Sequence, residues 1–254
     1  MRTAELLRPS RWLPTAVAAA VVLGAWQLVA TSTTAVLPTL GSIWSAFTGN
    51  AGTLFANAGD TLAEALPGLA GSYVVAVLLA VVMSQSRMLT RALLPLAIAL
   101  NVSPVIAFAP PLTVFLGLGQ MPRVVLAAII TFFPSLINAI VGLASADRGA
   151  VEVFETLHAS RWETLWRLRL PASLPYLFAA ARISAPLSIV GATVAEMVLG
   201  GVNVGLGRQI QTWSSYAELN LAWAGIAVLA FFGLLITGIV VALESWVLKA
   251  RGFR

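Results

Sequence analysis

The chain has 254 residues, of which 59% are hydrophobic and 10% are charged, and its formal net charge is +5. A water-soluble domain carries about 25% charged residues, so this chain has too few of them to cover a water-facing surface. It contains no cysteine and one histidine, His158, which excludes disulfides and thiolate ligands and argues against a metal site.

Several apolar stretches approach the roughly 20 helical residues that cross a bilayer. The first expected span covers residues 14–31. Arginines precede it as in a signal peptide, but no small-x-small cleavage site follows, so we expect it to remain as a membrane helix. Residues 32–64 are expected to form a loop with short helical pieces, and a second span follows at residues 66–84.

The apolar stretch at residues 92–118 is too long for one straight crossing and contains four prolines. Proline in a helix interior removes a hydrogen bond and kinks the chain. We therefore expect a short interfacial helix, a break between Asn101 and Pro104, and a kinked span that ends near Leu118. A tight turn at residues 117–122 then leads into the next span.

Three more spans are expected, at residues 123–144, 175–197 and 220–246. Six spans place both termini on one side, and twelve of the fifteen basic residues fall on that side. This bias predicts cytoplasmic termini and a cytoplasmic loop at residues 147–171. The basic residues flank apolar spans, so they predict contact with membrane lipid and not with nucleic acid. The fold class is an all-α polytopic membrane protein with about six transmembrane helices.

The loop at residues 147–171 is the one polar, charge-rich interior segment. Ser160 and Glu163 have the spacing of a capping box, which predicts a helix from near Arg161, and Pro171 is expected to end it. A second short helix is expected just before it, at about residues 148–157.

Three apolar side chains of the second loop helix, Trp162, Leu165 and Trp166, have the spacing that places them on one helix face. Such a hairpin of two helices could lie on lipid headgroups. A protruding surface of aromatic and arginine side chains is equally typical of a protein–protein contact.

The same loop resembles the cytoplasmic EAA loop of bacterial ABC importer permeases. The match rests on the spacing of Glu152, position 158 and the run Leu168-Arg-Leu-Pro171. Val153 and Phe154 replace the two alanines of that motif, and His158 replaces its hinge glycine. His158 is therefore expected to be a structural turn residue, and a regulatory role is the alternative. Either the turn is stiffer than with glycine, or the partner ATPase has a matching pocket.

The resemblance extends from about Leu37 to the C-terminus. Further short motifs are similar to the nitrate, sulfonate and taurine branch of these permeases, namely Leu116-Gly-Leu-Gly119, Ala159-Ser-Arg-Trp162, Leu170-Pro-Ala-Ser-Leu-Pro175, Arg182-Ile183, Ala195-Glu-Met197 and Gly205-Leu-Gly207.

The resemblance implies one type I importer-like permease domain over residues 1–254, with its core at about residues 55–247. The loop would couple to a separate ATP-binding subunit dimer, which would bind ATP and Mg²⁺, so this chain would not itself be an enzyme and would bind no cofactor. This chain has no Walker A motif of its own. The implied coupling residues are Glu152, Glu155, Leu157, His158, Ala159, Ser160, Arg161, Trp162 and Leu165.

Other partners follow from the same resemblance. They are a second permease copy or a paralogue, and a periplasmic or lipid-anchored solute-binding protein, at the bacterial inner membrane. The solute would be small, such as nitrate, a sulfonate, taurine or a thiamine pyrimidine precursor.

A translocation path is expected among the polar groups at membrane depth, because such groups by default face an interior or a cavity. The candidates are Asn101, Ser103, Ser184, Ser188 and Glu196. For the serines the alternative is close helix packing, and for Glu196 it is a surface carboxylate beside the glycine loop. Arg182 either faces the interior or extends to the lipid headgroups.

Two other functional classes are alternatives to the interpretation as an importer permease. A secondary transporter or channel would work alone and would ordinarily show an internal repeat, which is not evident here. An intramembrane enzyme would need a nucleophile–base or metal pair within the membrane. Neither class needs the loop at residues 147–171.

Overall fold

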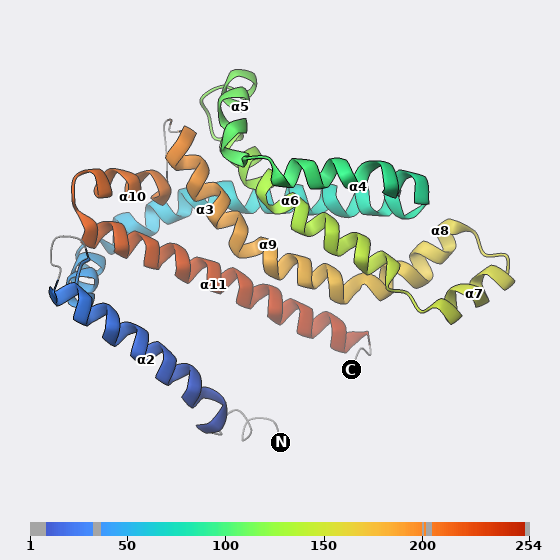
Figure 1. Ribbon diagram of the computed structural model, residues 1–254, viewed down its shortest axis with the longest axis horizontal. Coiled ribbons are helices and arrows are strands. Elements are labelled where there is room, and N and C mark those ends of the chain that lie inside the picture. The colour runs from blue at the N-terminus through green and yellow to red at the C-terminus, as the bar shows by residue number, and fades with distance from the viewer. Residues whose placement is uncertain (1–8, 33–36, 200, 202–204, 252–254) are drawn as a thin grey trace.

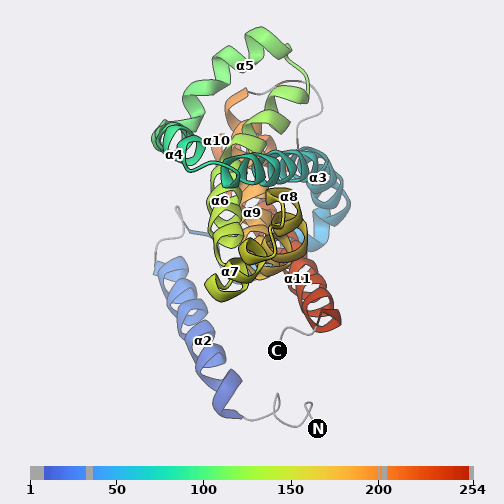
Figure 2. The same cartoon turned by 90° about the vertical axis from the view of Figure 1, so that its right-hand side faces the viewer.

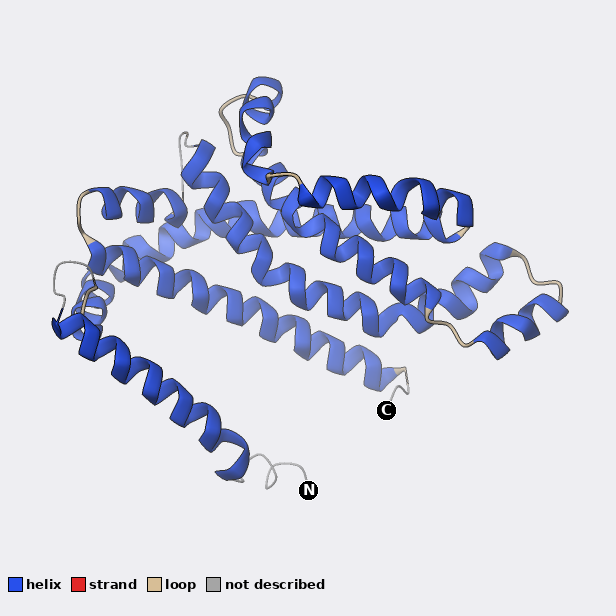
Figure 3. Ribbon diagram, in the orientation of Figure 1, coloured by secondary structure: helices blue, strands red, loops and turns tan. Residues whose placement is uncertain are grey.

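The computed structural model describes residues 9–32, 37–199, 201 and 205–251, and this part of the chain contains helices but no strands (Figure 3). The elements in chain order are α2 (Pro9–Ser32), α3 (Leu40–Ser84), α4 (Arg87–Val102), the 3₁₀ turn η1 (Val105–Phe108), α5 (Ala109–Leu116), α6 (Met121–Ala144), α7 (Arg148–Thr156), α8 (Arg161–Thr164), the π-helical turn η2 (Leu165–Arg169), α9 (Leu170–Leu199), α10 (Leu206–Ser215) and α11 (Leu219–Ala250).

Five helical stretches among the described residues are long and apolar enough to cross a membrane. They correspond to α2, α3, α6, the continuous stretch from α8 to α9, and α11. Figure 1 shows α3, α6, α9 and α11 along the length of the molecule, with α7 and α8 at one end and α10 at the other. The all-α membrane fold expected from the sequence is confirmed.

Helix α3 corrects the expected loop at residues 32–64. It has 45 residues and begins at Leu40, where the Thr39 side chain accepts a hydrogen bond from the Ser42 amide. One kink interrupts it at Asn50, whose φ and ψ are −127° and 18°. Asp60 and Glu64, without any Lys or Arg, made this stretch look like a loop, but Glu64 is buried against Arg123 of α6, and such contacts outweigh local propensity.

The third expected span is wrong as a single crossing. The predicted break is present, because α4 ends at Val102 and Ser103 has an extended ψ of 138° before Pro104. Helix α5 has only 8 residues, however, about 12 Å at 1.5 Å per residue, which is too short for a crossing. Two shorter apolar helices therefore occupy this stretch, and α4 runs beside α3 (Figures 1 and 2).

Small residues let α6 approach α3 and α9 closely. A Cβ atom on Gly68 of α3 would come within 2.8 Å of the Val124 carbonyl oxygen in α6. A Cβ atom on Gly142 of α6 would come within 2.8 Å of Tyr176 Cβ in α9. Close approach at small residues is a main source of helix association in membranes. These three helices form the centre of the bundle.

Pro171 does not end the loop helix, which corrects another expectation. Helix α8 continues through the π turn η2 into α9, so helical structure runs from Arg161 to Leu199. Proline lacks the amide that would complete the helical ladder, and wider π turns accommodate such defects inside helices. The π turn directly precedes Pro171, so the amphipathic segment and the membrane helix form one continuous helical element.

Helix α2 lies apart from the rest of the bundle (Figure 2). It is attached at its C-terminal end, where Trp26 Nε1 donates to the Pro38 carbonyl at 3.0 Å and the Trp26 ring meets Trp223 edge-on at 4.5 Å. Most of its surface is therefore available to lipid or to another subunit.

Candidate coupling site

A two-helix hairpin at one end of the bundle contains most of the predicted coupling residues. Helix α7 begins after Asp147, whose carboxylate accepts from the Ala150 amide at 2.9 Å. Helix α8 begins after Ser160, whose hydroxyl accepts from the Glu163 amide at 3.1 Å, as the capping pattern predicts. Glu163 instead pairs with Arg167 at 2.9 Å, so the reciprocal half of the capping box is replaced by an exposed ion pair.

The turn between the two helices places His158 in the left-handed region, with a φ of 54°. The His158 amide bonds to the Glu155 carbonyl, and the Ala159 amide bonds to the Phe154 carbonyl, both at 3.0 Å. This is the hydrogen-bond pattern of a Schellman motif, in which glycine is the usual left-handed residue. Position 158 thus has the conformation that the glycine of the resembled motif would adopt.

The outer surface of the hairpin is rich in exposed apolar and acidic side chains. Trp162 and Trp166 are 58% and 63% exposed, and Leu157 is 73% exposed. Glu152 and Glu155 are exposed beside them. Leu165, at 1% exposure, belongs instead to a core cluster with the residues Met83, Leu136, Ala139 and Leu143. Leu165 therefore packs into the core between the hairpin and the bundle and is not part of the hairpin's exposed surface.

Two arginines of the hairpin and the turn that follows it donate hydrogen bonds to the C-terminal end of α3. Arg161 Nη1 donates to the Gln85 carbonyl at 3.0 Å, and Arg169 Nη1 donates to the Ser84 carbonyl at 3.4 Å. The last carbonyls of a helix lack intrahelical partners and carry partial negative charge, so cationic side chains stabilise this end. The hairpin is therefore connected to α3 by these bonds and to α9 by the continuous helical backbone.

The predicted path serines lie in a helix interface. Ser184 is fully buried and its hydroxyl is 2.9 Å from that of Ser135 in α6. Ser188 is fully buried and donates to the Ala185 carbonyl of its own helix. The packing interpretation therefore fits both serines better than the path interpretation. Ser103 donates to the Ala99 carbonyl at 2.9 Å, and Asn101 alone of the five predicted residues lines a large cavity.

Glu196 is fully buried, which excludes the alternative of a surface carboxylate. Its Oε2 accepts from the Gly207 amide at 2.6 Å, and Thr61 Oγ1 accepts from the Leu206 amide at 2.9 Å. Helix α10 begins after Gly205, which has no side chain to cap it. Side chains from α3 and α9 thus satisfy the first amides of α10. A Cβ atom on Gly207 would clash with the Thr193 carbonyl oxygen and lie 2.6 Å from Glu196 Oε2, so this motif needs glycine.

A buried ion pair lies next to Glu196, and the sequence analysis did not find it. Arg123 Nε of α6 is 2.9 Å from Glu64 Oε1 of α3, and both side chains are 1% exposed. Arg123 attracts both Glu64 and Glu196, while the two carboxylates repel each other. We call Glu64, Arg123 and Glu196 the buried charge cluster. The only sequence signal for it was charge within or next to apolar stretches.

Arg182, which the sequence places within an apolar span, also has an ion-pair partner. Arg182 Nη2 of α9 is 3.1 Å from Glu244 Oε1 of α11, with the two side chains 43% and 14% exposed. Arg182 therefore links two helices and does not serve only to reach the lipid headgroups.

Comparison with known proteins identifies the kind of subunit to which these features belong. Residues 72–249, more than half of the chain, match the family described as the binding-protein-dependent transport system inner membrane component. The chain belongs to this family. The matched region includes the hairpin, Arg123, Glu196 and all but one residue, Gly71, of the cavity lined by Asn101.

Three relatives show the range of solutes named for such permeases. A formylaminopyrimidine transport permease protein of Halalkalibacterium halodurans is 34% identical over 75% of this chain and 76% of the relative. A riboflavin transport system permease protein of Chloroflexus aurantiacus is 33% identical over 76% of this chain and 71% of the relative. A nitrate import permease protein of Synechocystis sp. is 27% identical over 93% of this chain and 89% of the relative.

Proposed function

We propose that this permease is the translocating subunit of an ATP-driven importer and that the α7–α8 hairpin receives the force. The observation that carries the proposal is the hairpin geometry. Trp162 and Trp166 are exposed on a helix that continues into α9 without a break. A separate ATP-binding subunit, which would hold ATP and Mg²⁺, would bind this surface. Exposed aromatic side chains at a protruding site are typical of interaction hot spots.

The proposed arrangement has two permease chains, identical or paralogous, above two ATP-binding subunits. Each chain offers one hairpin, so two chains serve two subunits. In the proposed orientation the hairpin and both termini lie on the cytoplasmic side of the bacterial inner membrane, since most basic residues cluster on that side. Helices α4 and α5 together return the chain from the hairpin end, which keeps the number of passes even (Figure 1). A periplasmic or lipid-anchored binding protein delivers a small solute to the opposite end, where α10 lies (Figure 1).

Affinity purification from the native cell in mild detergent tests the proposal. One sample carries the unchanged chain, and a second carries Trp162→Ala with Trp166→Ala. A matched control carries Trp44→Ala with Trp246→Ala, because these tryptophans are 66% and 70% exposed and lie outside the hairpin. We expect an ATPase with Walker motifs to accompany the unchanged chain and the control, and to be lost from the hairpin variant.

Other results would contradict the proposal in distinct ways. Retention of the ATPase by the hairpin variant would show that the hairpin does not bind it, in favour of a hairpin on lipid headgroups. A native chain that is folded and monodisperse but brings no ATPase would favour the stand-alone transporter or channel.

A further inference from the structure

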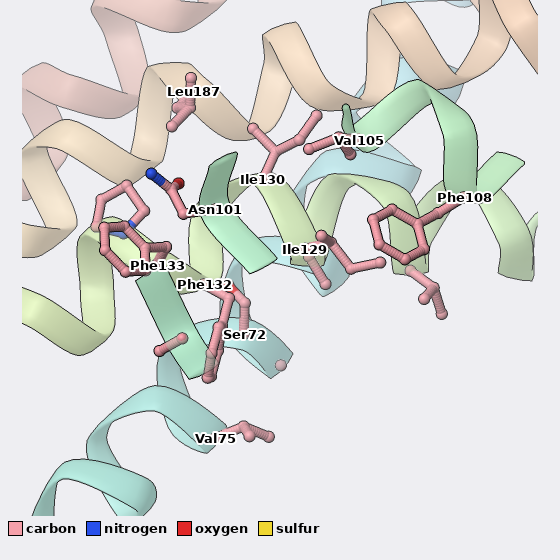
Figure 4. A pocket seen from close by; sticks show the side chains of 15 residues that line it. Ser72, Val75, Asn101, Val105, Phe108, Ile129, Ile130, Phe132, Phe133 and Leu187 are labelled. Carbon is pink, nitrogen blue, oxygen red and sulfur yellow. The ribbon is translucent and has the colours of Figure 1, made fainter. Parts of the chain in front are cut away.

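A cavity of about 580 Å³ lies among α3, α4, η1, α6 and α9 (Figure 4). Its wall includes the rings of Phe108, Phe132 and Phe133, together with Asn101 and Leu187. Figure 4 shows these side chains approaching the space from helices that are far apart in the sequence. Binding sites for small organic molecules typically have about 300–1,000 Å³ and a mostly apolar wall with few polar groups.

No charged side chain lines this cavity among the described residues. Its two polar side chains are Ser72 and Asn101. The Ser72 hydroxyl is already engaged, because it lies 2.6 Å from the Thr131 hydroxyl and 3.0 Å from the Leu69 carbonyl. Asn101 is exposed at the end of α4. Its amide is therefore the main group that can donate to and accept from a solute.

The break in the backbone gives independent support for a solute-accessible space. Asn101 and Val105 lie on either side of the interruption at Ser103 and Pro104, and both line the cavity. Irregular backbone at membrane depth is tolerated only where protein buries it or where it lines a cavity. Here it borders the cavity.

The two arginines that lie within the helical bundle are already paired and are not available to an anionic solute. Arg123 pairs with Glu64, and Arg182 pairs with Glu244. In the buried charge cluster Arg123 is already shared between Glu64 and Glu196, so it leaves no further cation for an anion. An anion in the cavity would lose its hydration without gaining a cationic partner, which is strongly unfavourable.

We propose that this cavity accepts an uncharged, flat heteroaromatic solute on its way through the permease. This inference rests on the proposed import function and names its substrate class. The phenylalanine rings offer faces and edges to a planar ring, and aromatic pairs gain stability beyond simple burial. The Asn101 amide pairs with ring nitrogen or carbonyl groups. Formylaminopyrimidine and riboflavin, the solutes named for two relatives, have this chemistry, whereas nitrate does not.

A single-cysteine experiment tests the inference, because the chain has no cysteine of its own. Val75→Cys places a thiol in the wall of the cavity, and Val74→Cys is its matched control. The two valines are neighbours on α3 with 55% and 56% exposure, but only Val75 lines the cavity. Each variant is assembled in nanodiscs with its ATP-binding subunit and reacted with a water-soluble maleimide.

Riboflavin, formylaminopyrimidine, nitrate and taurine are the probes. At a concentration ten times its Kd, a solute that occupies the cavity should slow alkylation of Val75→Cys about tenfold. We expect this protection from riboflavin or formylaminopyrimidine, no protection from nitrate or taurine, and none at Val74→Cys. Adding Asn101→Leu to the Val75→Cys variant should remove most of the protection.

Three results would overturn the inference. Protection by nitrate or taurine alone would assign the cavity to charged solutes. Protection by no probe would show that the cavity is not a solute site. A Val75→Cys thiol that does not react with the maleimide would show that lipid or a second copy of the chain fills the space. Each sample is checked for the bound ATP-binding subunit, so failure of the proposed import function would be recognised separately by its absence.

Discussion

The two ends of the bundle hold their charged side chains in contrasting ways. At the α10 end, Glu64, Arg123 and Glu196 are at most 1% exposed and come from three helices that are distant in the sequence. At the α7–α8 end, Arg161 is exposed, Arg169 is half-buried, and both donate to backbone carbonyls at the end of α3. Both arrangements join segments that are distant in the sequence, but the first is fully buried among three helices, whereas the second lies at the surface of a hairpin whose own fold depends on local helix caps and a turn. Substitutions at the α10 end should therefore disturb the whole fold, and those in the hairpin should act locally.

The largest effect is expected from Arg123→Met, which leaves two buried carboxylates without their cation. Removing one partner of a buried ion pair typically costs about 3–5 kcal/mol. We expect a large loss of thermal stability of the purified protein in detergent. Arg208→Met is the control, because Arg208 is exposed and contacts only Gln211 among the polar side chains that the structure describes.

A double variant sharpens this prediction. Glu64→Leu combined with Arg123→Met removes the ion pair as a unit, and replacing both partners by apolar groups is often far less costly than removing one. We expect the double variant to be more stable than Arg123→Met alone. Equal or lower stability would mean that the pair is not the main source of the effect.

An intermediate effect is expected from Gly207→Ala. Its Cβ would clash with the Thr193 carbonyl oxygen and crowd Glu196 Oε2, which accepts the capping bond of α10, and overpacking of this kind typically costs about 1–3 kcal/mol. Gly41→Ala is the matched control, since no atom lies within 4 Å of the added Cβ. Thermal unfolding in detergent compares the two. If both variants unfold at the same temperature, the close approach of α9 at Thr193 and Glu196 does not constrain the glycine.

The smallest effect is expected in the hairpin turn. His158→Gly should be nearly neutral, whereas His158→Val should cost about 1–2 kcal/mol, because a β-branched residue is unfavourable at a φ of 54°. Hydrogen exchange should show faster amide opening at residues 154–164 in the valine variant and unchanged exchange in α6. Faster exchange throughout the bundle would contradict the local character of this turn.

Much of the fold was predictable because hydrophobic length is a local property. The expected spans at residues 123–144 and 220–246 correspond closely to α6 and α11. The hairpin was also predictable, because Ser160 as a helix cap is encoded within a few residues and the resemblance to the importer permeases implied a turn at position 158. Helix α3 was misjudged between residues 40 and 64 because Asp60 and Glu64 resemble loop composition, and only the ion pair with Arg123 of α6 explains why Glu64 is buried there.

Sequence alone determined the membrane character of this protein, the position of its hairpin and its resemblance to importer permeases, because hydrophobicity, caps and turn geometry act over short separations along the chain. Tertiary structure alone decided which polar groups meet. It paired Glu64 with Arg123, turned Glu196 toward Gly207, placed Ser184 in a packing interface and left Asn101 beside an apolar cavity. The physical reason is that buried charge and polar groups are stable only with a partner, and the partner lies on another helix, at a sequence separation that local patterns do not report.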